Sequence, residues 1–198
     1  MHSGLPVRAR GYRFSMTTLT VRPYPILDED VARAVLAATR GDALLHAGTS
    51  LMLLAGLRPS EVRHVLVPDW APGADPQLTI REGIAARSIR IAPSAASALG
   101  GYLAGEDAEP DEPLLTGLEV QGRLERAFRT AMRRAGLTAG IHDLRRTAVA
   151  AVREDGTPPA HTRAYFGFRE TWDQPDEVAP REGYDRGIAA MLESSFAS

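Results

Sequence analysis

Apolar residues recur at helical spacing along most of the chain, which predicts a mainly helical domain. After Asp28, a typical N-cap residue, the apolar positions Val31, Ala34, Val35 and Ala38 follow the period of a helix. The nearly continuous apolar run at 43–56 predicts a second helix that is buried on most sides. Further helices are predicted at 59–67, 94–105, 120–136, 142–156, 159–168 and 184–198.

Residues 76–93 instead alternate between apolar and polar positions around Gly83, which is typical of a β-hairpin. Leu78 and Ile80 are the apolar positions of one arm, and Ile89 and Ile91 those of the other. We therefore predict a mainly α fold with a small antiparallel β-hairpin, an α+β arrangement.

Length and composition are those of one generous domain with a short arm. The 198 residues are 44% apolar, enough for a hydrophobic core. Residues 1–25 are basic and extended in character, so we expect an N-terminal arm at 1–25 and a folded domain at 26–198. No apolar run approaches the roughly 18 residues of a membrane span, and residues 1–15 do not resemble a secretory signal. We expect a cytoplasmic protein, without a membrane partner.

Two features of the charged residues narrow the chemistry. Cysteine is absent and all 23 basic residues are arginine, which excludes thiolate metal sites, cysteine nucleophiles and lysine chemistry. The net charge is only −2, yet residues 123–153 hold eight arginines against two acidic residues. This block is either a localised site for a polyanion or a solvated helix face.

Two short motifs place arginines where they can bind phosphate. In "GIHDLRRT", His142 and Arg145 are three residues apart, so a helix presents both on one face. A guanidinium can bind phosphate oxygens in a bidentate manner, and a histidine can transfer protons near neutral pH. In "LAGLRPSEV", Arg58 follows the buried helix directly, and Glu61 lies three residues further on. An arginine in that position needs an acidic residue or a phosphate as its partner.

Taken in order, these pieces resemble the catalytic domain of the tyrosine recombinase (phage integrase) family. The resemblance runs through "LMLLAGLRPSEVRHVLVPDW", "ARSIRIAPSAASALGGYL", "AGIHDLRRTAVAAVREDG" and "YFGF", and covers about residues 26–186. Gly167-Phe168 lies where the family has a Gly-His pair, with Phe168 23 residues beyond Arg145. The resemblance implies the fold of that catalytic domain.

The resemblance also implies a role for each matching residue. Arg58 and Arg145 would clamp the scissile phosphate, His142 would assist proton transfer, and Glu61 would orient Arg58 or a neighbouring helix. A tyrosine would attack the phosphorus and form a 3′-phosphotyrosyl link. No metal or other cofactor is implied. The partner would be double-stranded DNA, to which the arginines of the 120–136 helix are expected to bind: Arg123, Arg126, Arg129 and Arg133.

The sequence departs from the family pattern at four positions. The family's hairpin lysine is absent, and Arg81 is the nearest basic substitute on the hairpin. Arg146 and Phe168 stand where the family usually has histidines, and Glu177 stands where its nucleophile usually falls. Tyr184, sixteen residues beyond Phe168, is the best candidate nucleophile; the alternative is an aromatic residue that anchors the last helix.

Three functions remain open on the sequence alone. The first is a minimal site-specific DNA recombinase, of full or impaired activity, working on the nucleoid. The second is a degenerate recombinase fold that binds DNA without cutting it, as a regulator or architectural factor. The third is an unrelated helical protein with an arginine-rich interaction face. The last predicted helix, 184–198, could dock on a neighbouring subunit for self-association on DNA, or could cover its own core.

Overall fold

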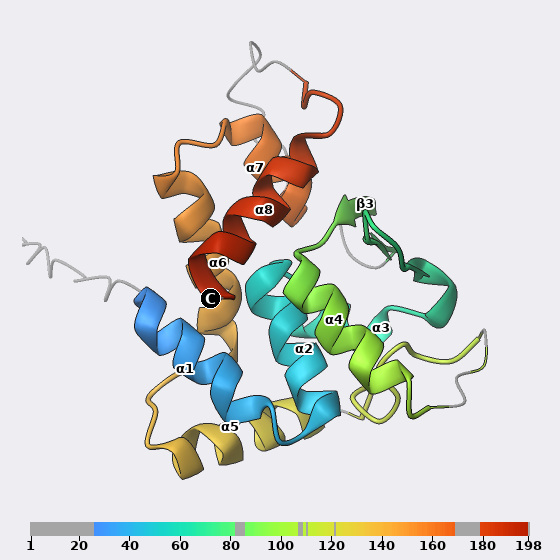
Figure 1. The fold of residues 1–198 in the computed structure, drawn as a ribbon, viewed down its shortest axis with the longest axis vertical. Helices are drawn as coiled ribbons and strands as arrows, with labels where there is room; N and C mark the ends of the chain where they lie inside the picture. Colours follow the sequence, from blue (N-terminus) through green and yellow to red (C-terminus); the bar gives the residue numbers. More distant parts are fainter. Residues whose placement is uncertain are drawn as a thin grey trace, which may run out of the picture.

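The computed structural model describes residues 26–81, 86–106, 109, 111–120, 122–168 and 179–197. The predicted arm at 1–25 and Glu177 therefore lie outside the described residues. Within them the fold is mainly helical with a small antiparallel sheet, which confirms the predicted fold class (Figure 1). The helices are α1 (Glu29–Thr39), α2 (Ala43–Leu54), α3 (Pro59–His64), α4 (Pro93–Leu103), α5 (Arg123–Ala135), α6 (Ile141–Glu154), α7 (Pro159–Phe166) and α8 (Tyr184–Phe196).

Local sequence signals set several helix ends as predicted. Asp28 is the N-cap of α1, and its carboxylate accepts a hydrogen bond from the Val31 backbone N–H at 2.9 Å. Gly136 ends α5 in the left-handed conformation, where glycine carries no steric penalty. Glycine and Asx residues thus decide where these helices begin and end.

Helix α2 lies at the centre of the molecule (Figure 1). It contacts α1, α4, α5, α6 and α8, and its residues from Ala47 to Leu54 are all buried. A helix that other helices surround has no solvent face, which is why its sequence is apolar on all sides. Because α2 is fixed so firmly, the segment that follows it, with Gly56 and Arg58, leaves the core at a defined position.

The sheet contains one more strand than the sequence predicted. Strand β2 (Gln77–Ile80) pairs antiparallel with β3 (Arg87–Arg90), with Leu78 opposite Ile89, as expected for the hairpin. Strand β1 (Trp70–Ala71), which follows a short 3₁₀ helix (η1, Val67–Asp69), adds to the free edge of β2. A strand of two residues carries no recognisable alternation, so the sequence could not predict it.

Helix α8 covers the core of its own chain. Its buried residues Ile188, Ala189, Leu192 and Phe196 face inward, and the helix contacts α1, α2, α6 and α7. Of the two roles considered for the C-terminal helix, the structure shows the intramolecular one. Within the described residues no helix has the length and apolarity that crossing a membrane requires.

Gly56 should be intolerant of any side chain, and Gly136 offers a matched control. Both adopt a left-handed backbone, with φ of +64° and +69°. A Cβ at Gly56 would lie 2.1 Å from Cε1 of Phe166, whereas a Cβ at Gly136 would meet nothing within 4 Å. Gly136→Ala should cost about 1 kcal/mol of backbone strain, and Gly56→Ala about 2 kcal/mol more, measured by urea unfolding. Equal losses would mean that the Phe166 ring moves aside freely.

Candidate phosphate-binding site

Glu61 is the centre of the candidate site, and its position follows from the start of α3. Arg58 is the N-cap residue of α3, Pro59 occupies its first turn, and Glu61 reaches back to the cap. The Arg58 backbone N–H donates to Glu61 Oε2 at 2.8 Å. The Glu61 side chain is only 2% exposed. The short turn between α2 and α3 thus buries a carboxylate beside the end of the central helix.

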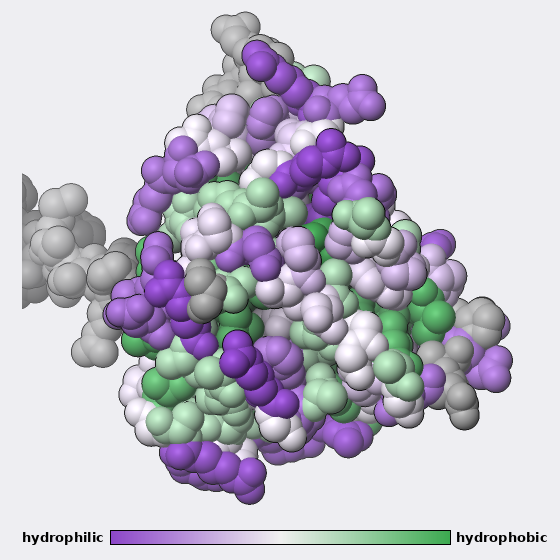
Figure 2. Space-filling model, in the orientation of Figure 1, coloured by the Kyte–Doolittle hydropathy of each residue, from purple (hydrophilic) through white to green (hydrophobic). Residues whose placement is uncertain are grey.

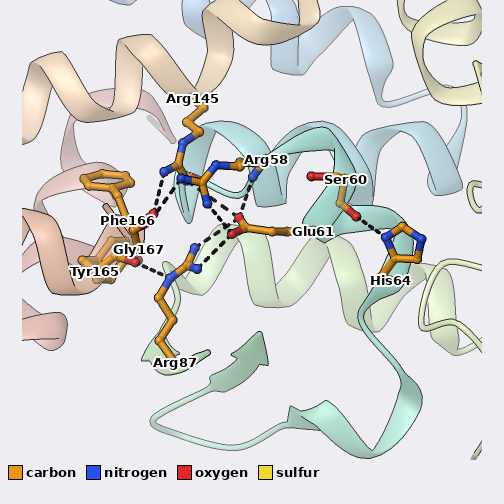
Figure 3. Close-up of polar contacts among 10 residues, drawn as sticks. Arg58, Ser60, Glu61, His64, Arg87, Arg145, Tyr165, Phe166 and Gly167 are labelled. Carbon is orange, nitrogen blue, oxygen red and sulfur yellow. Dashed lines mark hydrogen bonds and ion pairs between the residues drawn. The ribbon is translucent and has the colours of Figure 1, made fainter. Parts of the chain in front are cut away.

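Three guanidinium groups surround this one carboxylate (Figure 3). Arg58 Nη1 donates to Glu61 Oε1 at 2.8 Å, and Arg87 donates to both carboxylate oxygens, at 2.9 and 3.1 Å. Arg145 Nη1 lies 3.8 Å from Glu61 Oε2. Burial alone raises the pKa of Glu61, but the hydrogen bonds and charge of Arg87, together with the Arg58 backbone N–H and the charge of Arg145, hold the pKa below its ordinary value. Glu61 is therefore ionised at neutral pH.

Backbone carbonyls fix the orientation of the two predicted clamp arginines. Arg145 donates through Nη1 to the Gly56 carbonyl, and through Nη2 to the Phe166 carbonyl at 2.5 Å. Arg58 Nη2 donates to the Gly167 carbonyl at 3.1 Å. Burial, followed by the charge of Arg58, lowers the pKa of the Arg145 guanidinium. The end of α2 and the end of α7 thus hold both arginines against each other despite their like charge.

The site is open to solvent through a cavity of about 790 Å³. Its wall includes the predicted residues Arg58, His142, Arg145, Arg146 and Phe168, and also Arg153. The structure therefore brings together the two predicted clamp arginines and the predicted histidine. Arg146 and Phe168, which stand where the family usually has histidines, lie in the same wall. An anion in this cavity could accept hydrogen bonds from Arg58 and Arg145, since each guanidinium has five N–H groups and uses only some of them on the protein.

His142, Arg146 and Phe168 are the other predicted residues in the cavity wall. His142 lies exposed in the first turn of α6, and Arg146 pairs with Asp143 at 3.1 Å. The Phe168 ring lies 5.2 Å from the Arg145 guanidinium and 5.7 Å from that of Arg153. Phe168 cannot donate a hydrogen bond to a phosphate, but it packs against the cation that would bind one.

Two predicted residues lie apart from this cluster. Arg81 pairs with the buried Asp69 and is itself 62% exposed. Tyr184 opens α8, and its ring centroid lies 5.3 Å from that of His161, with the two ring planes tilted by 34°. The described residues that line the cavity do not include either of them. Burial and then the charge of Asp185 raise the pKa of Tyr184, which keeps its hydroxyl protonated in this conformation.

Sequence reasoning missed Arg87, although a signal was present. Arg87 lies two and four residues before the buried Ile89 and Ile91, so its side chain is on the same face of the sheet. It also pairs across the sheet with the buried Ile80. A charged residue at an inward-facing strand position requires a buried partner. Arg81 follows Ile80 directly and so points to the opposite face, toward Asp69.

The arginines of α5 are exposed, as a DNA-binding role requires. Arg123, Arg126, Arg129 and Arg133 are all on the surface. The lower edge of the molecule in Figure 2, where Figure 1 places α5, is strongly hydrophilic. Arg123 and Arg126 border a second cavity, of about 690 Å³, between α5 and the turn from α1 to α2. Glu125, on another face of α5, lines the cavity of about 790 Å³ that contains Arg58 and Arg145. Only part of α5 thus faces the site.

Comparison with solved structures identifies the fold. No protein-family model matches the chain, and a search of curated proteins finds no match. XerA recombinase matches with a TM-score of 0.66 and 20% identity, over 86% of this chain and 64% of XerA. XerH recombinase, solved in a pre-cleavage complex with its difH substrate, matches with a TM-score of 0.60 and 15% identity, over 73% of this chain and 47% of XerH. The lambda integrase catalytic core matches with a TM-score of 0.55 and 16% identity, over 75% of this chain and 95% of that core.

The class that these comparisons define is the catalytic-domain fold of tyrosine recombinases and integrases. The chain has that fold, and it spans less than two thirds of the XerA and XerH chains that it matches. At identities of 15 to 20% the likeness shows the fold alone. Activity has to be argued from the site itself.

Proposed function

We propose that this protein is a site-specific DNA recombinase that breaks and rejoins DNA through a 3′-phosphotyrosine intermediate. The observation that carries the proposal is the excess of positive charge at the site. Among the described residues that line the open cavity, five are arginines and one is acidic, and two of these arginines, Arg58 and Arg145, also lie against the buried carboxylate of Glu61. Such a concentration of partly buried cations is costly, and a phosphodiester bound in the cavity would supply compensating negative charge.

The bound phosphate would have Arg58 and Arg145 on its non-bridging oxygens. Both guanidiniums are pre-oriented by carbonyl groups, so they can stabilise the additional charge of a pentacoordinate transition state without rearranging. Tyr184 would attack the phosphorus, forming a P–O bond to its phenolic oxygen and breaking the bond to the 5′ oxygen. The tyrosine loses a proton and the released 5′-hydroxyl gains one, with His142 assisting this transfer.

The partner in this proposal is double-stranded DNA. XerH, which shares the fold, is solved with its difH substrate, and the exposed arginines of α5 would add contacts to the phosphate backbone here. Tyr184 does not line the cavity, so DNA binding has to bring its hydroxyl to the clamped phosphate. Such a protein would act in the cytoplasm on nucleoid DNA. Self-association on DNA through α8 would use the exposed face of that helix, opposite the face that packs on its own core.

The second candidate is a recombinase fold that binds DNA without cutting it. The position of Tyr184 outside the cavity and the presence of Phe168 in its wall favour this function. In both cases the cationic cavity binds the DNA backbone; the two functions differ only in whether a covalent link forms.

Covalent capture separates the two functions. The wild type and Tyr184→Phe are expressed in the cell of origin, the cells are lysed under denaturing conditions, and any DNA that stays attached to the protein is sequenced. We expect attached DNA with the wild type and none with Tyr184→Phe, which lacks the nucleophilic oxygen but keeps the ring. If the wild type retains no DNA while native crosslinking recovers specific sites, the protein is the non-cutting DNA binder.

A further inference from the structure

Arg87 connects β3, where its side chain is buried, with two other parts of the site. Its side chain is only 6% exposed. Nη1 and Nη2 donate to the two oxygens of Glu61, and Nε donates to the Tyr165 carbonyl at 2.7 Å (Figure 3). A planar guanidinium is suited to such a set of contacts, because its donors lie in one rigid fork. The sheet is thereby joined to the start of α3 and to the last turn of α7.

Arg87 contacts one group that binds a clamp arginine directly and one that adjoins such groups. Glu61, its carboxylate partner, also accepts hydrogen bonds from the backbone and side chain of Arg58. Tyr165, its carbonyl partner, directly precedes Phe166 and Gly167, whose carbonyls accept from Arg145 and Arg58. A shift of the Arg87 guanidinium would therefore displace the acceptors of both clamp arginines together.

The backbone at Gly167 shows how closely Arg87 fits against α7. Gly167 has φ of +63°, and a Cβ placed on it would lie 2.6 Å from Arg87 Nη1 and 3.0 Å from its Cζ. Only a residue without a side chain allows the guanidinium to lie in this place. The glycine of the "YFGF" segment thus provides room for Arg87, in addition to its conformation at the end of α7.

We infer that Arg87 is a positioning residue of the phosphate clamp. This inference rests on the proposed function and deepens it: Arg87 does not line the cavity or touch the phosphate, but sets the orientation of Arg58 and Arg145 through Glu61 and the end of α7. In a chain without lysine, strand β3 then contributes to the site through the buried ion pair between Arg87 and Glu61.

Phosphate binding tests this without knowledge of the DNA target. Inorganic orthophosphate is titrated into the ¹⁵N-labelled full chain, and the Nε–H resonances of Arg58 and Arg145 are followed by NMR. The wild type should show saturable shifts of both resonances. Arg87→Gln should raise the phosphate Kd by about tenfold or more, as expected when binding groups are displaced by a fraction of an ångström. Arg87→Lys should fail to restore the affinity, because it keeps the charge but not the fork.

Two further variants separate positioning from loss of folding. Arg90→Gln removes another partly buried guanidinium from β3, one that pairs with Asp185, and should leave the phosphate Kd within about twofold, because the clamp geometry is kept. Gly167→Ala keeps Arg87 but pushes its guanidinium away, so it should weaken phosphate binding as Arg87→Gln does. If the Arg87 variants do not fold, unchanged phosphate binding in Gly167→Ala still overturns the positioning role.

The outcomes also distinguish this inference from the function on which it rests. The positioning role is overturned if Arg87→Gln or Gly167→Ala binds phosphate as the wild type does, or if Arg87→Lys restores the affinity. Either result leaves the proposed phosphate clamp intact. A wild type whose Arg58 and Arg145 resonances do not respond to orthophosphate overturns both.

Discussion

Arg145→Ala should reduce covalent DNA capture by about 10² to 10³-fold, the loss typical of removing one pre-oriented donor from a transition-state site. Arg145 is 11% exposed, lines the cavity, and is held by the carbonyls of Gly56 and Phe166. The adjacent Arg146 is more exposed and pairs with Asp143. Arg146→Ala should lower capture by about fivefold or less, because an exposed charged contact contributes about 1 kcal/mol or less.

The comparison is made by quantifying protein-linked DNA from equal amounts of folded protein. Arg145→Lys is the matched control for charge: it restores a cation but cannot donate to the two carbonyls and a phosphate at once, so its activity should stay close to that of Arg145→Ala. If Arg145→Ala and Arg146→Ala lose capture equally, the "HDLRRT" segment does not present Arg145 as the principal phosphate ligand.

The elements of this fold that the sequence predicts are those with strong local patterns. The apolar run at 43–56 predicts a buried helix, and the alternation at 76–93 predicts a two-faced strand pair; the structure has both. Asp28 and Gly136 set helix ends through contacts with their immediate neighbours. In each of these cases the energetic reason for the structure lies within a few residues of the position concerned.

The parts of the site that the sequence does not predict depend on contacts between distant segments. Glu61 and Arg87 are 26 residues apart, and the Arg145 acceptors at Gly56 and Phe166 are 89 and 21 residues away. The one local difference between Arg87 and Arg81 is that Arg87 lies on the inward face of β3, with Ile89. The location of Tyr184 beside His161, outside the cavity, likewise depends on how α7 and α8 pack.

Glu61 is expected to be the main electrostatic anchor of the domain. Glu61→Gln should lower the free energy of unfolding at pH 7 by about 3 to 5 kcal/mol, the usual cost of removing one partner from a buried ion pair. The neutral amide keeps the size of the side chain but leaves three guanidinium groups without their shared anion. Asp75→Asn is the matched control, since Asp75 also pairs with two arginines but is exposed; its loss should be much smaller because solvent screens those pairs.

The stability difference between the wild type and Glu61→Gln should depend on pH, and this dependence identifies the Glu61 carboxylate as the source of the stabilisation. The pKa of Glu61 in the folded protein lies below its ordinary value of 4.5, so the folded state releases the proton more readily than the unfolded chain. The stabilisation is therefore fully present above pH 4.5 and is lost as the pH falls through the folded pKa. Urea unfolding of the wild type and Glu61→Gln should show a constant difference from pH 7 down toward pH 5 and a shrinking one below pH 4.5. A difference that does not change with pH would show that the packing of the side chain, and not its charge, holds the three arginines in place.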